Sequence, residues 1–349
     1  MNQKFGWLVK LVIGLALLIG ASGTALGDEF YKGKTILFIV GLPPGGGYDT
    51  YTRAVARHIG KYIPGNPASI VQNMVGAGSL NAAHYIYNKA KPDGLTVGVW
   101  NSGLVLRQAL GDKAVKFEAD QFGWIGAPGK VYLTCAVMAF TGLKTLKDVL
   151  NSKRPIKMGG SRPGLVTHDL PRILNLTLGT KFDLIPGYEG TSRIRIAMQT
   201  REVDGACWPW DSMRVTARSM LDAKGENKLI LFLITHGDLQ DPEVKDLPRL
   251  TEVVTSEEKR AMLNAYLLQF SFYFPFTLPP GTPKERLAIL RKAFKATLRD
   301  PEFLAQAKGS NLVINYVSVE EIATFLDQIL AISPKTKAKL QFLVSEKGK

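Results

Sequence analysis

A glycine-rich loop between a short apolar run and an amphipathic segment constrains the fold of this chain more than any other feature. Residues 36–40 are apolar and rich in β-branched and aromatic types, which predicts a buried strand. After the loop at residues 41–48, apolar side chains recur with the spacing of one helix face, at Tyr51, Val55, Ile59 and Tyr62. Asp49 is predicted to cap the start of that helix. The unit is therefore a strand, a glycine-rich loop and a helix.

Such a loop delivers backbone N–H groups to a helix N-terminus, where the helix dipole favours an anion. The pattern of a phosphate-binding loop fails, because Gly47 and Tyr48 stand where lysine and serine or threonine are required. The dinucleotide-binding pattern fails as well, because Thr50 occupies the position of its last glycine. The alternative is a tight turn that uses glycine only for a positive φ.

Residues 1–27 have the features of a secretory signal peptide. Lys4 and Lys10 precede an apolar run at residues 11–19, and Ala25 and Gly27 place small residues at the −3 and −1 positions of a cleavage site. The apolar run is too short for an ordinary transmembrane helix. No later stretch is long and apolar enough to span a bilayer, so we expect the rest of the chain to be exported as a soluble protein of the periplasm.

Charge and cysteine content narrow the classes of partner. The net charge of +14 falls to +12 without the two lysines of the predicted signal peptide. Basic residues are dispersed and no run of five occurs, which disfavours nucleic acid as a partner. Cys135 and Cys207 could pair in an oxidising compartment or remain two buried thiols. No CxxC motif and no His/Cys cluster is present, so we expect no metal and no cofactor.

Strands alternate with helices along the chain, which predicts an α/β architecture with a mainly parallel sheet. Three further glycine-containing loops precede helical segments, at residues 76–79, 159–164 and 186–192. Two of the four loops fall in each half of the chain. Ligands bind beyond the carboxyl ends of the strands in such sheets, and all four loops are expected there.

Several short motifs occur in a fixed order: Pro43-Pro44-Gly45-Gly46-Gly47-x-Asp49, Gly76-Ala77-Gly78, Lys91-Pro92-Asp93-Gly94, Pro186-Gly187-Tyr188-x-Gly190, Val203-Asp204, Pro280-Gly281-Thr282-Pro283 and Asp300-Pro301-Glu302. In this order they resemble the extracytoplasmic solute receptors of tripartite tricarboxylate transporters, the Bug family. No single motif is specific, and the strength of the resemblance lies in the ordered set.

The resemblance implies a hinged, two-lobed fold of the type II periplasmic binding proteins, with the ligand cleft between the lobes. Lobe 1 would comprise residues 28–128 and 229–349, and lobe 2 residues 129–228. A monomeric protein of this kind would capture a small carboxylate by lobe closure and deliver it to the membrane permease subunits of a tripartite tricarboxylate-type transporter. Its ligand would rest on backbone amides of the first glycine loop.

Carried over by position, the resemblance implies ligand-binding residues from both lobes. From lobe 1 they are Leu42, Gly45, Gly46, Gly47, Tyr48, Asp49, Ser79, Asn81, Asn101 and Ser102. From lobe 2 they are Ser161, Arg162, Gly164, Thr167, His168, Tyr188, Glu189, Gly190, Thr191 and Asp204.

Three departures from the family pattern bear on the ligand. Tyr48 stands where the family usually has a small threonine and would narrow the pocket. Arg162, in a loop that is typically small and uncharged, could bind a distal carboxylate of the ligand bidentately or face solvent. Trp208 adds aromatic bulk, and like Trp100 it could stack on a planar ligand or pack in a core.

Two other functions compete with transport. An exported hydrolase has little support, because HExxH is missing and the sequence around Ser161 lacks the closing glycine of a nucleophile elbow. We therefore expect no enzyme and no catalytic residue. The same lobes could instead report a ligand to a membrane signalling kinase. Di- and tricarboxylates, amino-acid-like acids and aromatic acids all remain open as ligands.

Overall fold

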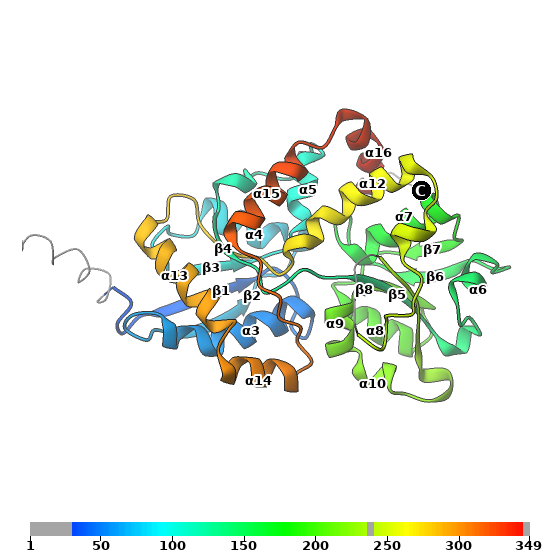
Figure 1. Ribbon diagram of the computed structural model, residues 1–349, viewed down its shortest axis with the longest axis horizontal. Helices are drawn as coiled ribbons and strands as arrows, with labels where there is room; N and C mark the ends of the chain where they lie inside the picture. Colours follow the sequence, from blue (N-terminus) through cyan, green and yellow to red (C-terminus); the bar gives the residue numbers. More distant parts are fainter. Residues whose placement is uncertain (1–29, 236–240, 345–349) are drawn as a thin grey trace, which may run out of the picture.

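The structure is a computed structural model that describes residues 30–235 and 241–344. The predicted signal peptide, residues 1–27, lies outside this part of the chain. Figure 1 shows two α/β lobes side by side along the long axis of the molecule, which confirms the predicted fold class. Within the described ranges, no helix is both long enough and apolar enough to cross a bilayer.

The first lobe contains a five-stranded sheet. Its strands are β1 (Thr35–Val40), β2 (Ala68–Asn73), β3 (Thr96–Val99), β4 (Gly123–Gly126) and β10 (Phe276–Leu278). They lie in the order β2-β1-β3-β10-β4. β1 runs parallel to β2 and β3, whereas β10 runs antiparallel to β3 and β4. The apolar run that follows the predicted signal peptide is thus the parallel centre of this sheet.

The second lobe repeats this arrangement. Its strands are β5 (Leu133–Met138), β6 (Ile156–Gly159), β7 (Phe182–Ile185), β8 (Gly205–Pro209) and β9 (Leu229–Ile234). They lie in the order β7-β6-β8-β5-β9, with β6 parallel to β7 and β8 and with β5 antiparallel to β8 and β9. In each sheet, the antiparallel strand is the first strand that the chain forms after it crosses from the other lobe: β10 in the first sheet and β5 in the second.

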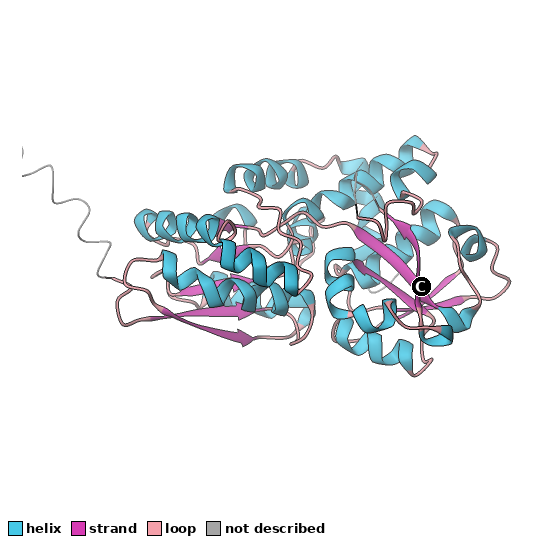
Figure 2. Cartoon of the chain, turned by 60° about the horizontal axis from the view of Figure 1, so that its bottom comes forward, coloured by secondary structure: helices cyan, strands magenta, loops and turns pink. Residues whose placement is uncertain are grey.

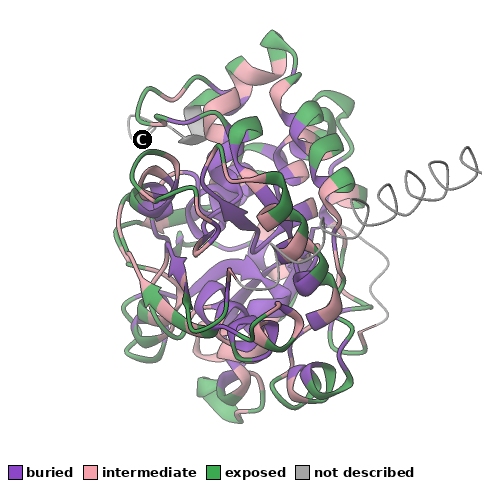
Figure 3. Ribbon diagram, turned by 90° about the vertical axis from the view of Figure 1, so that its left-hand side faces the viewer, coloured by how far each residue is buried: buried purple, intermediate pink, exposed green. Residues whose placement is uncertain are grey.

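Helices pack around both sheets, and the central strands are buried, whereas the edge strand β2 has no buried residue (Figures 2 and 3). Those associated with the first sheet are α3 (Gly47–Ile59), α4 (Leu80–Asn88), α5 (Gly103–Ala109), α13 (Lys284–Thr297), α14 (Pro301–Gly309) and α15 (Val319–Leu330). The other helices are α6 (Leu146–Leu150), α7 (Val166–Leu178), α8 (Thr191–Gln199), α9 (Trp210–Thr216), α10 (Arg218–Leu221), α11 (Leu250–Val253), α12 (Glu257–Leu267) and α16 (Pro334–Val344). Short 3₁₀ helices complete the described elements: η1 (Gly60–Tyr62), η2 (Ala77–Ser79), η3 (Ala119–Gln121), η4 (Ala139–Thr141), η5 (Gly225–Asn227) and η6 (Leu268–Phe272).

Two segments that connect the lobes pair with each other. Residues 127–131 lead from β4 to β5, and η6 leads back towards β10. The Tyr273 N–H donates to the Gly129 carbonyl (3.0 Å), and the Val131 N–H donates to the Phe270 carbonyl (3.1 Å). Gly129 and Tyr273 form an antiparallel bridge. A paired connection of this kind can act as a hinge, because a few backbone torsions absorb the motion of whole lobes.

Two elements, β9 and α16, lie outside the lobe to which the predicted boundaries assign them. The predicted lobe 1 includes residues 229–349, but β9 pairs with β5 in the second sheet, and α16 packs against α7 and α12. The backbone groups of β5 need hydrogen-bond partners on both sides of the strand. β8 supplies them on one side, and the apolar run at residues 229–234, which is β9, supplies them on the other. The chain therefore leaves the second sheet only after Ile234, and it returns to that side at its C-terminal end (Figure 1). The remaining division into lobes stays a prediction.

The two cysteines, whose pairing the sequence left open, form a disulfide in the second sheet. Cys135 on β5 lies directly opposite Cys207 on β8, with 4.1 Å between the Cα atoms, and both side chains are buried. The bond joins the strand that arrives from the hinge to a strand that ends at Pro209.

Candidate ligand-binding site

A cavity of about 50 Å³ lies between the two lobes. It is much smaller than the several hundred Å³ of a typical ligand cleft, so the lobes are close together in this structure. Residues of the first lobe that line it are Leu42, Pro43, Gly46, Gly47, Tyr48, Tyr273 and Phe274. Residues of the second lobe are Ser161, Leu165, Val166, Thr167, Gly190, Thr191, Ser192, Pro209 and Ser212.

Three helices longer than two turns begin at the cavity. α3, α7 and α8 contribute their N-caps and first residues to the lining, at positions 46–48, 165–167 and 190–192. The first N–H groups of a helix have no intrahelical acceptor, and the helix dipole places partial positive charge there. Three such ends around one small cavity give it an electrostatic environment that suits an anion.

The two lobes touch around this cavity. The Asn101 side chain of the first lobe donates to the Gly164 carbonyl of the second (2.9 Å), and both residues are buried. A Cβ atom on Gly47 would lie 2.7 Å from Ser212 Oγ, and one on Gly46 would lie 3.8 Å from Thr191 Oγ1. The N-termini of α3 and α8 are therefore in contact across the cleft, and a side chain at position 47 would keep the lobes apart.

The conformation of the first loop depends on Asp49, although not as an N-cap. The N-cap of α3 is Gly46, whose φ of −92° any residue can adopt, whereas Gly45 has a φ of +75°. The Asp49 carboxylate, in the first turn, accepts hydrogen bonds from the Gly45 N–H (3.1 Å), Arg53 (2.9 Å) and Asn73 (3.0 Å). Burial opposes its charged form, but these hydrogen bonds outweigh burial and lower the pKa of Asp49. The left-handed turn at Gly45 is thus held by a charged group outside the cavity.

Ser161 places an unpartnered hydroxyl in the cavity lining. Its side chain is 3% exposed, and within the described part of the chain its Oγ atom has no hydrogen-bond partner. Its backbone N–H is satisfied by Thr167 Oγ1 (3.1 Å). Leaving a buried hydroxyl unpaired costs free energy, so native structures rarely do so without a reason. A ligand that accepts or donates a hydrogen bond here would supply that reason.

Aromatic rings form one wall of the cavity. The rings of Tyr48, Tyr273 and Phe274 pack on one another with centroids 4.7 to 5.1 Å apart. Phe274 has a φ of +55°, which is unusual for a bulky residue and persists only where the surroundings enforce it. Burial, together with the neighbouring Tyr273 phenol, raises the pKa of Tyr48 well above its usual value. Burial also raises the pKa of Tyr273 to about 12, so both phenols stay protonated.

Eight of the site residues predicted from the sequence line the cavity: Leu42, Gly46, Gly47, Tyr48, Ser161, Thr167, Gly190 and Thr191. The lining positions that were not predicted are Pro43, Leu165, Val166, Ser192, Pro209, Ser212, Tyr273 and Phe274. Four of these, Pro43, Leu165, Val166 and Ser192, are next to a predicted residue in the chain. Tyr273 and Phe274 come from the returning hinge segment, and no local pattern linked them to the glycine loops.

Other predicted residues lie behind the lining and support it. The Ser79 hydroxyl accepts from the Asn101 N–H (3.1 Å), and the Ser102 hydroxyl donates to the Gln269 carbonyl (2.8 Å). The Asn101 side chain also accepts from the Gly103 N–H (3.1 Å). Together with Asp49 and Gly164, these residues fix the loops from which the lining residues project.

The remaining predicted residues lie away from the cavity lining. Gly45, Asn81, Arg162 and Glu189 are exposed, and the half-buried Tyr188 donates to Glu202 (2.6 Å). Asp204 directly precedes β8 and so lies at the other end of that strand from Pro209. Arg154 binds both of its carboxylate oxygens there (2.7 and 3.0 Å). Trp100 and Trp208 are fully buried and do not line the cavity.

Ser161, His168 and Asp169 lie close in sequence but lack the contacts of a catalytic triad. The His168 ring contacts Asp169 through Nδ1 (2.8 Å), whereas the Ser161 hydroxyl has no partner in the described residues. Burial raises the pKa of Asp169, which the contact with His168 opposes in part. A serine nucleophile requires a hydrogen bond to its base. In the same part of the chain, no group of three or more His, Cys, Asp or Glu residues could hold a metal ion.

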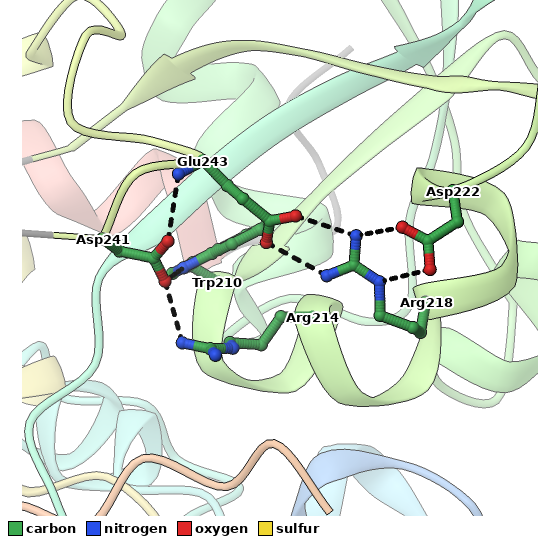
Figure 4. A network of polar contacts seen from close by, with 6 residues as sticks. All are labelled: Trp210, Arg214, Arg218, Asp222, Asp241 and Glu243. Carbon is green, nitrogen blue, oxygen red and sulfur yellow. Dashed lines mark hydrogen bonds and ion pairs between the residues drawn. The ribbon is translucent and has the colours of Figure 1, made fainter.

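A polar network joins α9 and α10 to the segment that follows β9 (Figure 4). Asp241 accepts from the Trp210 indole (2.9 Å) and from Arg214 (2.8 Å). Arg218 pairs with Asp222 and with Glu243 (2.5 and 2.8 Å). The network holds the first turns of α9, which present Pro209 and Ser212 to the cavity.

Beside this network, Asp211 is 2% exposed, and its Oδ2 atom has no hydrogen-bond partner among the described residues. Burial raises its pKa to about 7, although Arg214 lowers it and Asp241 raises it further. The folded state then binds this proton more tightly than the unfolded state, so its stability falls as the pH rises from the ordinary pKa of 3.8 towards 7 and levels off above that.

We expect Asp211→Asn to remove this dependence. Between pH 5.5 and 7.5, the free energy of unfolding of the wild type should fall by roughly 1–2 kcal/mol more than that of the variant. Urea unfolding of both proteins at the two pH values measures this difference. If the free energy of unfolding changes equally with pH in the two proteins, Asp211 does not titrate in this range.

Comparison with known proteins gives one curated relative and many solved structures. No family model matches the chain. A UPF0065 protein encoded in the tcbD–tcbE intergenic region of Pseudomonas sp. strain P51 is 22% identical over 305 residues, which span 86% of this chain and 84% of that protein. UPF0065 is the Bug family.

Among solved structures, the periplasmic binding protein BugD has a TM-score of 0.70 and 20% identity, over 90% of this chain and 98% of that one. MatC from Rhodopseudomonas palustris, solved with malate, has a TM-score of 0.64 and 19% identity, over 89% and 99%. Rpa4515 from R. palustris, solved with adipate, has a TM-score of 0.69 and 15% identity, over 88% and 97%. The chain therefore has the fold of periplasmic binding proteins. Of the proteins that it resembles across its length, BugD and MatC are binding proteins of the Bug type, not enzymes.

Proposed function

We propose that the chain is a periplasmic solute-binding receptor of the Bug type that captures a small carboxylate between its lobes. In this proposal it then delivers the carboxylate to the membrane permease of a tripartite tricarboxylate-type transporter. The observation that carries the proposal is the cavity between the lobes, where α3, α7 and α8 begin and where Ser161 has a buried, unpartnered hydroxyl. Two of the similar structures were solved with carboxylates, malate and adipate.

The arrangement of the lobes supports capture by closure. The cavity is lined from both lobes, so a ligand in it bridges them and favours the closed state over the open one. Tyr273 belongs both to the paired hinge segments and to the lining, which links the hinge directly to the ligand. The disulfide between Cys135 and Cys207 agrees with an exported protein, because such bonds persist in oxidising compartments.

A thermal-shift screen of residues 28–349 tests the proposal. The protein is unfolded and refolded first, to release any ligand that was carried through purification, and is then mixed with mono-, di-, tri- and aromatic carboxylates. A ligand that binds only the folded state raises the melting temperature, by an amount that corresponds to about 2.7 kcal/mol at 100 times its Kd. We expect at least one class to do so. No shift with any carboxylate would refute the proposal.

Ser161→Ala should weaken carboxylate binding without destabilising the protein. Because Ser161 Oγ has no partner in the described residues, its removal breaks no protein hydrogen bond, whereas loss of a hydrogen bond to the ligand costs about 3- to 10-fold in affinity. Ser79→Ala is the matched control for stability, because the buried Ser79 hydroxyl does have a protein partner: it accepts from the Asn101 N–H. Loss of this hydrogen bond should lower the free energy of unfolding by about 1 kcal/mol. Calorimetric titration and urea unfolding report both quantities. Unchanged affinity in Ser161→Ala would exclude this hydroxyl from the site.

A further inference from the structure

Asp211 is an ionisable residue at the place where the two lobes meet. It is the second residue of α9, next to Ser212, and a Cβ on Gly47 of the first lobe would lie 2.7 Å from Ser212 Oγ. α3 and α9 pack against each other across the cleft. Asp211 is 2% exposed, and within the described ranges its Oδ2 atom has no hydrogen-bond partner. An unpaired carboxyl oxygen is thus buried between two elements that belong to different lobes.

The first lobe faces Asp211 with the ring of Tyr51, one turn after Gly47 on α3. Burial raises the pKa of Tyr51 well above its usual value, and the nearby Asp211 carboxylate raises it further. The Tyr51 ring stacks on Phe274, with centroids 4.3 Å apart, and the Tyr51 hydroxyl donates to the Val313 carbonyl (3.2 Å). Because its single proton is used there, this phenol stays neutral and does not neutralise the Asp211 charge.

The second lobe compensates the Asp211 charge only in part. Hydrogen bonds from the backbone N–H groups of Asp211 itself and of Tyr132 favour the carboxylate, as does the positive charge of Arg214. Arg214, however, pairs with Asp241 (2.8 Å), whose negative charge disfavours the carboxylate of Asp211. The buried Arg214 Nε atom has no partner among the described residues, and the other charges of the network in Figure 4 pair with one another. Burial outweighs the favourable contacts, so the pKa of Asp211 is raised to about 7.

From this placement we infer that closure of the lobes takes up a proton at Asp211, so that acid conditions favour the closed, ligand-holding state. The inference rests on the proposed function, because closure around the ligand is part of it, and adds a dependence on pH.

The sign follows from the environment of the carboxyl group in the two states. Separation of α3 from α9 admits water to Asp211, and water favours the charged form, whereas closure buries the group and favours the neutral form. The closed state therefore has the raised pKa. Its stabilisation by the proton is complete below the ordinary pKa of 3.8 and is lost as the pH rises through about 7.

Calorimetric titration in buffers of different ionisation enthalpy counts the protons taken up on binding. The ligand is the tightest-binding carboxylate of the screen, which includes benzoate, succinate, malate, adipate and citrate, and the buffers are MES and imidazole at pH 6.5 and HEPES and Tris at pH 8. At pH 6.5 the wild type should take up roughly 0.7 protons per ligand more than Asp211→Asn, and at pH 8 roughly 0.1 more. Protons bound by the ligand itself cancel in this comparison.

The affinity for the same ligand gives a second measure. Between pH 5.5 and 7.5, the affinity of the wild type should fall about tenfold relative to that of Asp211→Asn, whose amide stays neutral throughout. Asp183→Asn is the matched control, because Asp183 is an exposed carboxylate of the second lobe outside the cavity lining, and it should behave as the wild type does. If the wild type and Asp211→Asn take up equal numbers of protons and show equal pH dependence, the inference is wrong while the proposed function stands. If no carboxylate binds at any of these pH values, the proposed function fails as well.

Discussion

Thr191→Pro is expected to weaken carboxylate binding by about 10- to 100-fold while leaving the fold intact. Thr191 is the first residue of α8, a position at which proline fits because its N–H has no intrahelical acceptor. The preceding Gly190 has an extended ψ of 175°, which is compatible with a following proline. The substitution removes the backbone N–H of a residue that lines the cavity, and a hydrogen bond to a charged group contributes about 1.5–3 kcal/mol.

Two controls isolate the contribution of that N–H. Thr191→Ala keeps the backbone donor and removes only the side-chain hydroxyl, so its affinity should stay within about threefold of wild type. Lys284→Pro places proline at the first position of α13, on an exposed residue outside the cavity lining, and should not affect binding. Calorimetric titration with the best carboxylate of the screen measures all three variants. Wild-type affinity in Thr191→Pro would mean that the N-terminus of α8 does not hold the ligand.

Removal of the disulfide is expected to have the largest effect on stability. The bond closes a loop between residues separated by 72 positions, and constraint of the unfolded chain over such a loop contributes about 4 kcal/mol. The doubly substituted Cys135→Ala, Cys207→Ala protein should therefore unfold at a clearly lower urea concentration than the wild type. Addition of a reducing agent to the unfolded wild type should lower its refolded stability by a similar amount.

The disulfide also connects to a strand that contributes to the cavity lining. It joins β5, the first strand after the hinge, to β8, whose end presents Pro209 to the cavity. We expect the double variant to bind carboxylates at low temperature with reduced affinity. Two free thiols in the unreduced wild type, measured by mass spectrometry after alkylation, would contradict this assignment.

The first strand, loop and helix were predictable from the sequence because their signals are local. The apolar run at residues 36–40 is β1, and the helical spacing that follows is α3. The role of Asp49 was not predictable, since the capping position is taken by the backbone of Gly46 and the carboxylate instead binds the N–H of Gly45. Nothing in the spacing alone distinguishes these two uses of an acidic residue near a helix start.

The site was predictable only where it is built from glycine loops. Those loops supplied Gly46, Gly47 and Gly190, but the aromatic wall depends on Tyr273 and Phe274, more than 200 residues after the first loop. Their place at the cavity follows from the return of the chain through the hinge, which is a property of topology. Asp204 is the opposite case: it matches a family motif, yet it lies outside the cavity lining, where Arg154 binds its carboxylate.

A crystal structure of residues 28–349 with the best carboxylate of the screen would show directly whether the ligand lies between the lobes on the helix N-termini. We expect the carboxylate oxygens to lie about 3 Å from backbone nitrogens at the starts of α3 and α8, with Ser161 Oγ at hydrogen-bonding distance from the ligand. Both lobes should contact the ligand, and the Asn101 side chain should still donate to the Gly164 carbonyl. A carboxylate bound away from these helix N-termini, or held by one lobe alone, would contradict this placement.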